Sequence, residues 1–165
     1  MLTIDTGNGG ILELKHVVFD VNGTLTKDGQ LVKGTVERIH ALRQLLTVHL
    51  LTADTYRTQE AHINVLLAVD RDPKISWRIL DPKDGPEDEQ KGLYVAALGP
   101  TIVAAVGNGR NDRVMLKKAK LGIAVVGPEG ASAEALAAAT IVASDPITAI
   151  DLLLHPLRLK ASLRF

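Results

Sequence analysis

The stretch HVVFDVNGTLTKDG, residues 16–29, decides how this sequence is interpreted. Its first six residues are rich in β-branched side chains and end at the turn signal Asn22-Gly23, so they predict a buried strand that runs into a tight turn. The strand brings the carboxylate of Asp20 to that turn. Two residues later stands Asn22, an amide in a place where a second acid could have donated a proton. The stretch therefore predicts a candidate nucleophile with no acid beside it.

Outward from this stretch, short apolar runs alternate with helical patterns. Further strands are predicted at 48–53, 75–80, 101–106, 121–126 and 140–143, and helices at 35–46, 55–69, 86–98, 111–119, 131–139 and 146–154. Such regular alternation predicts a mainly parallel sheet with helices on both faces. The predicted fold class is α/β, a doubly wound Rossmann-like three-layer sandwich, and residues 1–165 are expected to form one domain. The closing residues RLKASLRF, 158–165, are interpreted as a terminal tail.

Composition excludes several classes of protein. The charges of nineteen basic and nineteen acidic residues cancel. The chain therefore lacks the excess of basic residues that is typical of nucleic-acid-binding proteins. The longest apolar run, ALAAATIVA at 135–143, is about half of the ~18 residues that a membrane span needs. The first ten residues lack the basic and apolar segments of a signal peptide. With no cysteine, disulfides and thiolate metal sites are excluded. We therefore expect a cytoplasmic protein that binds neither a membrane nor nucleic acid.

Polar residues follow the predicted strands at the edge where parallel sheets bind ligands. They are Asp20, Asn22, Gly23 and Thr24 after the first strand, Thr52 and Ala53 at the second, Asn108 and Asp112 after the fourth, and Lys91 on the preceding helix. Singly, each is more commonly a turn, cap or surface residue. Together they offer a carboxylate that can form an aspartyl-phosphate, and donors that can hold phosphate oxygens. Two carboxylates at neighbouring strand ends require a cation between them, and Mg²⁺ fits.

These motifs, taken in order, resemble those of the haloacid dehalogenase-like (HAD) superfamily of phosphotransferases. The matching segments are VVFDVNGTLT, LLTADT, Lys91 (which fits better than Lys83) and GNGRND. The resemblance covers most of the chain. GNGRNDRVML followed by LGIAV looks closest to the phosphorylation domain of P-type ATPases and its small soluble relatives. The short spacings leave no room for a cap domain, only for a flap hairpin at about 25–33 with its turn at Asp28-Gly29.

The resemblance implies a role for each motif residue. Asp20 would be the nucleophile, in a catalytic set completed by Asn22, Thr52 and Lys91. The phosphoryl group would be held by Gly23, Thr24, Thr52, Ala53 and Lys91. Mg²⁺ would be bound by Asp20, the backbone carbonyl of Asn22, Asn108 and Asp112.

Two positions depart from the family pattern. Asn22 stands where the phosphatases of the family carry a general acid. General acid catalysis raises a reaction rate by ~10²–10⁴-fold. P-type ATPases also carry a non-acid there, which predicts phosphorylation with slow turnover. Asn108 replaces the acid that usually ligates Mg²⁺, so metal affinity is expected to fall.

The first function hypothesis is therefore a Mg²⁺-dependent phosphohydrolase that acts, slowly, on a small phosphate ester through Asp20. The alternative is a non-catalytic relative that uses the same pocket to bind phosphate or metal, or to assemble with partners. A receiver domain of the response-regulator type is a weaker third reading, because its acidic pair near the first strand is missing. An open, capless site also predicts a homo-oligomer.

Overall fold

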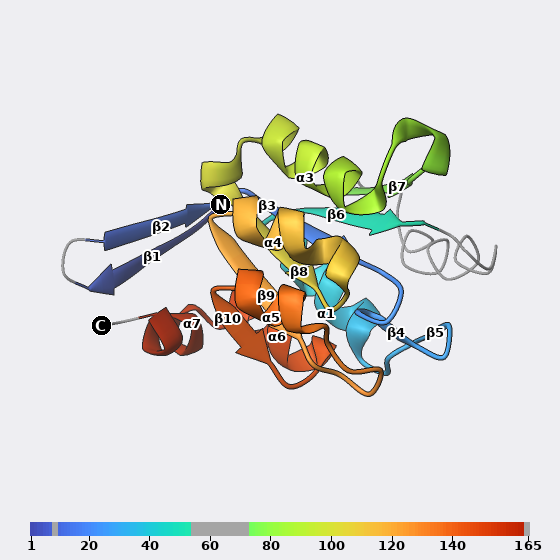
Figure 1. The fold of residues 1–165 in the computed structure, drawn as a ribbon. Helices are drawn as coiled ribbons and strands as arrows, with labels where there is room; N and C mark the ends of the chain where they lie inside the picture. Colours follow the sequence, from blue (N-terminus) through green and yellow to red (C-terminus); the bar gives the residue numbers. More distant parts are fainter. Residues whose placement is uncertain (8–9, 54–72, 164–165) are drawn as a thin grey trace.

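The computed structural model of the protein describes residues 1–7, 10–53 and 73–163 (Figure 1). The helix predicted at 55–69 lies outside these residues. At the centre is a six-stranded sheet whose neighbouring strands are all parallel. In spatial order the strands are β10 (Ile141–Ala143), β9 (Leu121–Val125), β8 (Val103–Gly107), β3 (His16–Asp20), β6 (Thr47–Thr52) and β7 (Ile75–Ile79). The predicted α/β class is confirmed.

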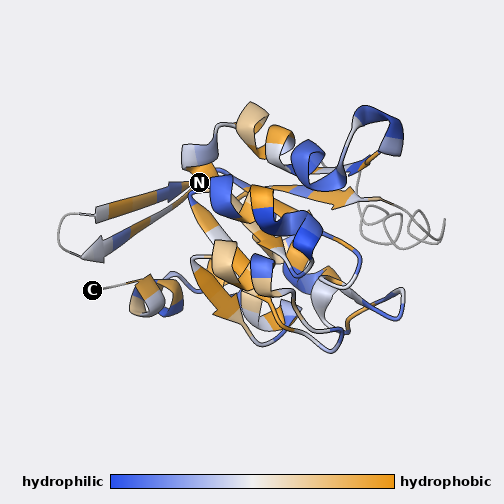
Figure 2. Cartoon of the chain, viewed as in Figure 1, coloured by the Kyte–Doolittle hydropathy of each residue, from blue (hydrophilic) through white to orange (hydrophobic). Residues whose placement is uncertain are grey.

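Helices cover both faces of this sheet, because the strands are apolar on both sides. On one face lie α1 (Thr35–Leu42) and α6 (Pro146–Leu154), whose side chains join Val17 and Phe19 in one core cluster. On the other lie α3 (Glu87–Leu98), α4 (Arg113–Lys118) and α5 (Ala133–Ala138), which pack around Val18 and Leu51. Figure 2 shows apolar residues gathered along the sheet between these layers. The three-layer sandwich follows from the alternation of Val17, Val18 and Phe19 between the two faces.

Several boundaries differ from the sequence prediction. Helix α1 ends at Leu42 rather than at 46, and three residues in 3₁₀ conformation, Pro100–Ile102, precede β8. Two further short 3₁₀ segments, Pro82–Asp84 and Arg110–Asp112, precede α3 and α4. Among the helices of the described chain, none is long and apolar enough to cross a bilayer.

The two ends of the chain form structure that the sequence analysis missed. Strands β1 (Leu2–Gly7) and β2 (Gly10–Leu14) make an antiparallel hairpin that projects from the body (Figure 1). The predicted tail is wrong, because Pro156–Leu163 is helix α7, which lies against β1 and buries Leu159. The hairpin had a signal in its alternation, since Leu2, Ile4, Leu12 and Leu14 are buried while their neighbours face solvent.

The predicted flap hairpin is present after the first strand. Strand β4 (Thr26–Lys27) pairs antiparallel with β5 (Gln30–Leu31) through the turn Asp28-Gly29. Both turn residues have positive φ, 51° and 74°, as a two-residue hairpin turn of the I′ type requires.

Two histidines, His16 at the start of β3 and the buried His49 on β6, lie side by side. The Nδ1 atom of His16 is 3.1 Å from Nε2 of His49, whose Nδ1 contacts the hydroxyls of Ser76 and Tyr94 at 2.8 and 3.0 Å. Only 7 % of His49 is exposed. Burial, with the positive charge of His16 as a smaller cause, lowers the pKa of His49 from 6.5 to about 4. This histidine is therefore neutral in the folded protein at neutral pH.

Acid is expected to destabilise the fold through His49. Between pH 6.5 and about 4 unfolded His49 binds a proton that folded His49 does not, so the contribution of His49 to the free energy of unfolding falls as pH falls. Allowing for solvent screening, we expect a loss of ~2 kcal/mol. Urea unfolding at neutral pH and near pH 4.5 measures it. His49→Gln should lose most of this pH dependence, whereas the exposed control His155→Gln should keep it. Equal pH dependence in both variants would contradict the assignment.

Candidate active site

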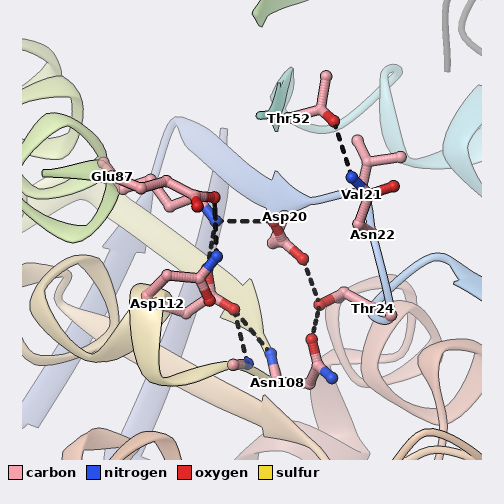
Figure 3. Close-up of polar contacts among 12 residues, drawn as sticks. Asp20, Val21, Asn22, Thr24, Thr52, Glu87, Asn108 and Asp112 are labelled. Carbon is pink, nitrogen blue, oxygen red and sulfur yellow. Dashed lines mark hydrogen bonds and ion pairs between the residues drawn. The ribbon is translucent and has the colours of Figure 1, made fainter. Parts of the chain in front are cut away.

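The polar strand ends meet at one edge of the sheet (Figure 3). Asp20 is the last residue of β3, Thr52 the last of β6 and Gly107 the last of β8, and these strands are direct neighbours. The chain leaves the central strand β3 toward β6 on one side and later returns to β8 on the other. This is the switch point at which doubly wound sheets bind their ligands.

The turn after β3 is shaped by Gly23. Its φ of 73° favours glycine, and a Cβ there would lie 2.9 Å from the carboxylate of Glu129 and 3.0 Å from the amide of Asn108. The N–H of Gly23 donates to Oγ1 of Thr26, at 3.2 Å, so this predicted phosphate donor already has a partner. Thr24 is buried and its hydroxyl donates to Oδ2 of Asp20 at 2.9 Å.

Lys91 is the electrostatic centre of the site. It is fully buried on α3, and its Nζ lies 2.7 Å from Asp20, 2.8 Å from Asp112 and 2.9 Å from Glu87. Burial acts to lower the pKa of Lys91, but these three negative charges outweigh it and raise the pKa. The ammonium is thus held charged. Lys83, the less favoured alternative, is exposed.

Asp112 holds this ammonium in place rather than facing an open space. Its Oδ1 accepts from Lys91, and its Oδ2 accepts from the main-chain N–H groups of Asn108 and Gly109, at 2.9 Å each. The cation between Asp20 and Asp112 is therefore the lysine. In the described parts of the chain, no three His, Asp or Glu side chains are grouped so as to hold a metal ion.

Asp20 is the nucleophile candidate, and its surroundings shift its titration. Burial, with the nearby charge of Asp112 as a second cause, raises the pKa of Asp20 to about 7, although Lys91 and Thr24 act in the opposite direction. A carboxylate with Lys91 on one oxygen and a hydroxyl on the other is held in one orientation. This arrangement suits nucleophilic attack by the carboxylate of Asp20 on an electrophilic group that is bound together with a cation.

Three oxygens converge beside Asp20 with a single proton among them. The hydroxyl of Thr24 lies 2.9 Å from Oδ2 of Asp20 and 2.9 Å from Oδ1 of Asn108, and it can donate to only one of them at a time. The amide of Asn108 is held by its other end, since Nδ2 donates to the carbonyl of Gly130. A hard divalent cation prefers such oxygen ligands, so this donor set fits Mg²⁺ or a similar ion.

Asn22 contacts the hydroxyl predicted to hold phosphate. Its Nδ2 lies 3.2 Å from Oγ1 of the fully buried Thr52 (Figure 3). The next residue, Ala53, lines a cavity of about 510 Å³ together with Pro86, Glu87 and Gln90. Glu87 therefore lies both beside Lys91 and on the wall of this cavity.

Glu87 also joins the site, which the sequence analysis did not predict. Its Oε1 accepts from Nδ2 of Asn111 at 2.7 Å and pairs with Lys91. The spacing of four residues between Glu87 and Lys91 was the available signal, because such pairs meet on one helix face.

Similar proteins have this fold. A protein assigned to the HAD hydrolases, from Streptomyces avermitilis, has a TM-score of 0.63 and 24% identity over 86% of this chain and 84% of its own. The 3-deoxy-D-manno-octulosonate 8-phosphate phosphatase of Moraxella catarrhalis was solved with magnesium and phosphate ions. It has a TM-score of 0.62 and 18% identity over 88% of each chain. The cobalt-bound deoxy-D-mannose-octulosonate 8-phosphate phosphatase of Haemophilus influenzae has a TM-score of 0.62 and 18% identity, over 87% of this chain and 89% of its own.

Similarity in sequence covers a smaller part of the chain than similarity in fold. An uncharacterised protein of Methanocaldococcus jannaschii is 48% identical over 62 residues, which are 38% of this chain and 67% of that protein. No protein-family model matches the chain. The likeness to the solved structures, all under 25% identical, shows the fold.

Proposed function

We propose that this chain, which has the fold of the haloacid dehalogenase-like superfamily, is a divalent-metal-dependent phosphohydrolase that acts through an aspartyl-phosphate on Asp20. The observation that carries the proposal is the buried ion pair of Lys91 and Asp20, 2.7 Å apart. A desolvated lysine beside a carboxylate at a sheet switch point stabilises an anion that binds there. The narrower likeness to P-type ATPases stays a prediction.

In this mechanism a carboxylate oxygen of Asp20 attacks phosphorus, and the bond from phosphorus to the ester oxygen breaks. The hydroxyl of Thr52 and the ammonium of Lys91 hold the phosphoryl oxygens as negative charge develops on them. Asp112 keeps Lys91 aimed at Asp20 through its own bonds to the turn amides. Water then attacks the aspartyl-phosphate and restores the carboxylate.

A divalent cation is part of the proposal. Asp20, Asn108 and the main chain of Asn22 would hold it, beside the crowded oxygens at Thr24. When bound, it supplies positive charge to the phosphoryl oxygens. Of the four predicted metal ligands, Asp112 is the least available to a cation, because both of its oxygens already accept hydrogen bonds from Lys91 and from main-chain N–H groups. We take Mg²⁺ as the first ion to test, and the substrate as a small phosphate ester.

The wild type is expected to hydrolyse an activated aryl phosphate only when Mg²⁺ is present. Asp20→Asn should lose this turnover, because an amide cannot act as the nucleophile. Release of the aryl alcohol is followed by absorbance, with Lys83→Gln as an exposed control that should match wild type. Turnover that persists in Asp20→Asn would refute a mechanism through phosphorylated Asp20.

Asn22 favours a second candidate, a phosphate-binding protein that no longer turns over. Its amide is bonded to Thr52 where an acid would otherwise face the leaving group. In that case the wild type binds phosphate and Mg²⁺ in calorimetry but hydrolyses nothing, and Asn22→Asp is active. A homo-oligomer, expected from the open site, stays a prediction that light scattering would test.

A further inference from the structure

The proposed hydrolysis lacks one chemical group, a base for the water that attacks the aspartyl-phosphate. Asn22 cannot serve, because an amide does not accept a proton from water at neutral pH. The base must be a carboxylate or imidazole that faces the space beside Asp20 and Lys91.

Most acids near Asp20 in the described chain are already committed. Both oxygens of Asp112 are bound, and the residue is fully buried. Asp88 pairs with Arg113 at 2.6 Å. Glu129 accepts from the N–H of Asp28 on the flap with Oε1, at 2.8 Å, and its Oε2 lies beside Gly23, on the Asn108 side of Asp20 and not on the Lys91 side.

Glu87 is different in three respects. Its side chain is 31 % exposed, while Lys91 beside it is fully buried. Its Oε1 is fixed by Lys91 and Asn111, at 2.9 and 2.7 Å, whereas its Oε2 takes no hydrogen bond from the described part of the chain. It also lines the 510 Å³ cavity that reaches Ala53, next to the phosphate hydroxyl of Thr52. One oxygen is thus anchored and the other is free at the mouth of the site.

We infer that Glu87 is the general base of the dephosphorylation step, in the role that Asn22 cannot fill. This inference rests on the proposed function. Water enters from the cavity and attacks phosphorus, a new oxygen–phosphorus bond forms, and the bond to Asp20 breaks with its electron pair returning to the carboxylate. The proton that the water loses passes to Oε2 of Glu87, which releases it to solvent through its exposed side.

The test separates formation of the phosphoenzyme from its decay. Wild type, Glu87→Gln and Glu89→Gln are mixed with an activated aryl phosphate and Mg²⁺, and the initial burst of aryl alcohol is recorded. The phosphoenzyme is then freed of substrate, and its decay is followed by intact mass after acid quenching. Gln at 87 keeps an acceptor for Lys91 and Asn111, so the fold and the burst should persist. Glu89 is a matched control, because it is an exposed acid in the same first turn of α3.

We expect Glu87→Gln to show the wild-type burst while its phosphoenzyme decays ~10²-fold more slowly. Glu89→Gln should behave as wild type in both steps. Unchanged decay in Glu87→Gln would overturn the inference. So would a parallel loss of burst and decay, because Glu87 would then act only by positioning Lys91. If the wild type forms no phosphoenzyme at all, the proposed function fails first and the inference with it.

Discussion

Replacing Asn22 with aspartate is expected to raise the hydrolysis of alkyl phosphates by ~10²–10⁴-fold. An alkoxide is a poor leaving group and needs a proton as its bond to phosphorus breaks, and only an acid can donate it. The side chain of residue 22 already reaches the hydroxyl of Thr52, at 3.2 Å. An aspartate there can accept from that hydroxyl, so the change adds a titratable group without removing a contact.

Two substrates make this measurement specific. Steady-state rates on an alkyl phosphate should rise strongly in Asn22→Asp, whereas rates on an activated aryl phosphate should rise much less, because that leaving group needs no proton. Asn22→Ala is the control, and it should gain nothing with either substrate. An equal gain with both substrates would mean that the aspartate acts on the phosphoenzyme and not on the leaving group. No gain with the alkyl ester would refute the role assigned to residue 22.

The second large effect is expected from Lys91→Met, which should lower the free energy of unfolding by ~3–5 kcal/mol. The ammonium lies within 2.8 Å of both Asp20 and Asp112, and all three side chains are almost fully buried. Methionine keeps the volume but leaves two carboxylates facing each other without a cation. The repulsion between them, together with burial, then raises the pKa of Asp20 further above its ordinary value.

This change has its own pH signature. In Lys91→Met the folded state holds a proton on Asp20 that the unfolded state has already lost, so its stability should increase as pH falls from 8 toward 5. Denaturant unfolding at these pH values measures the effect. Adding Asp112→Asn to Lys91→Met should recover part of the loss, since one of the two opposed charges is removed. A small loss that does not depend on pH would show that the charges are solvated, contrary to the burial described above.

Local sequence patterns determined the scaffold and the strand ends. The apolar runs and the glycine and proline positions predicted the central sheet, because strand formation and helix capping depend on residues near in sequence. They also placed Asp20 and Thr52 at the ends of neighbouring strands, at the switch point of the sheet. The N-terminal hairpin and α7 escaped prediction because each depends on the other for burial. Within the described residues, β1 and β2 pair only with one another, and α7 packs on β1.

Only the tertiary structure decided what the site residues do to one another. The sequence named Asp20, Lys91 and Asp112, but their contacts join positions 71 and 21 residues apart. It could not show that the lysine is the cation between the two acids, nor that Glu87 has one oxygen anchored by Lys91 and Asn111 and lines the cavity. Electrostatic energies depend on distance and on exclusion of water, and both arise only when α3 packs against the strand ends.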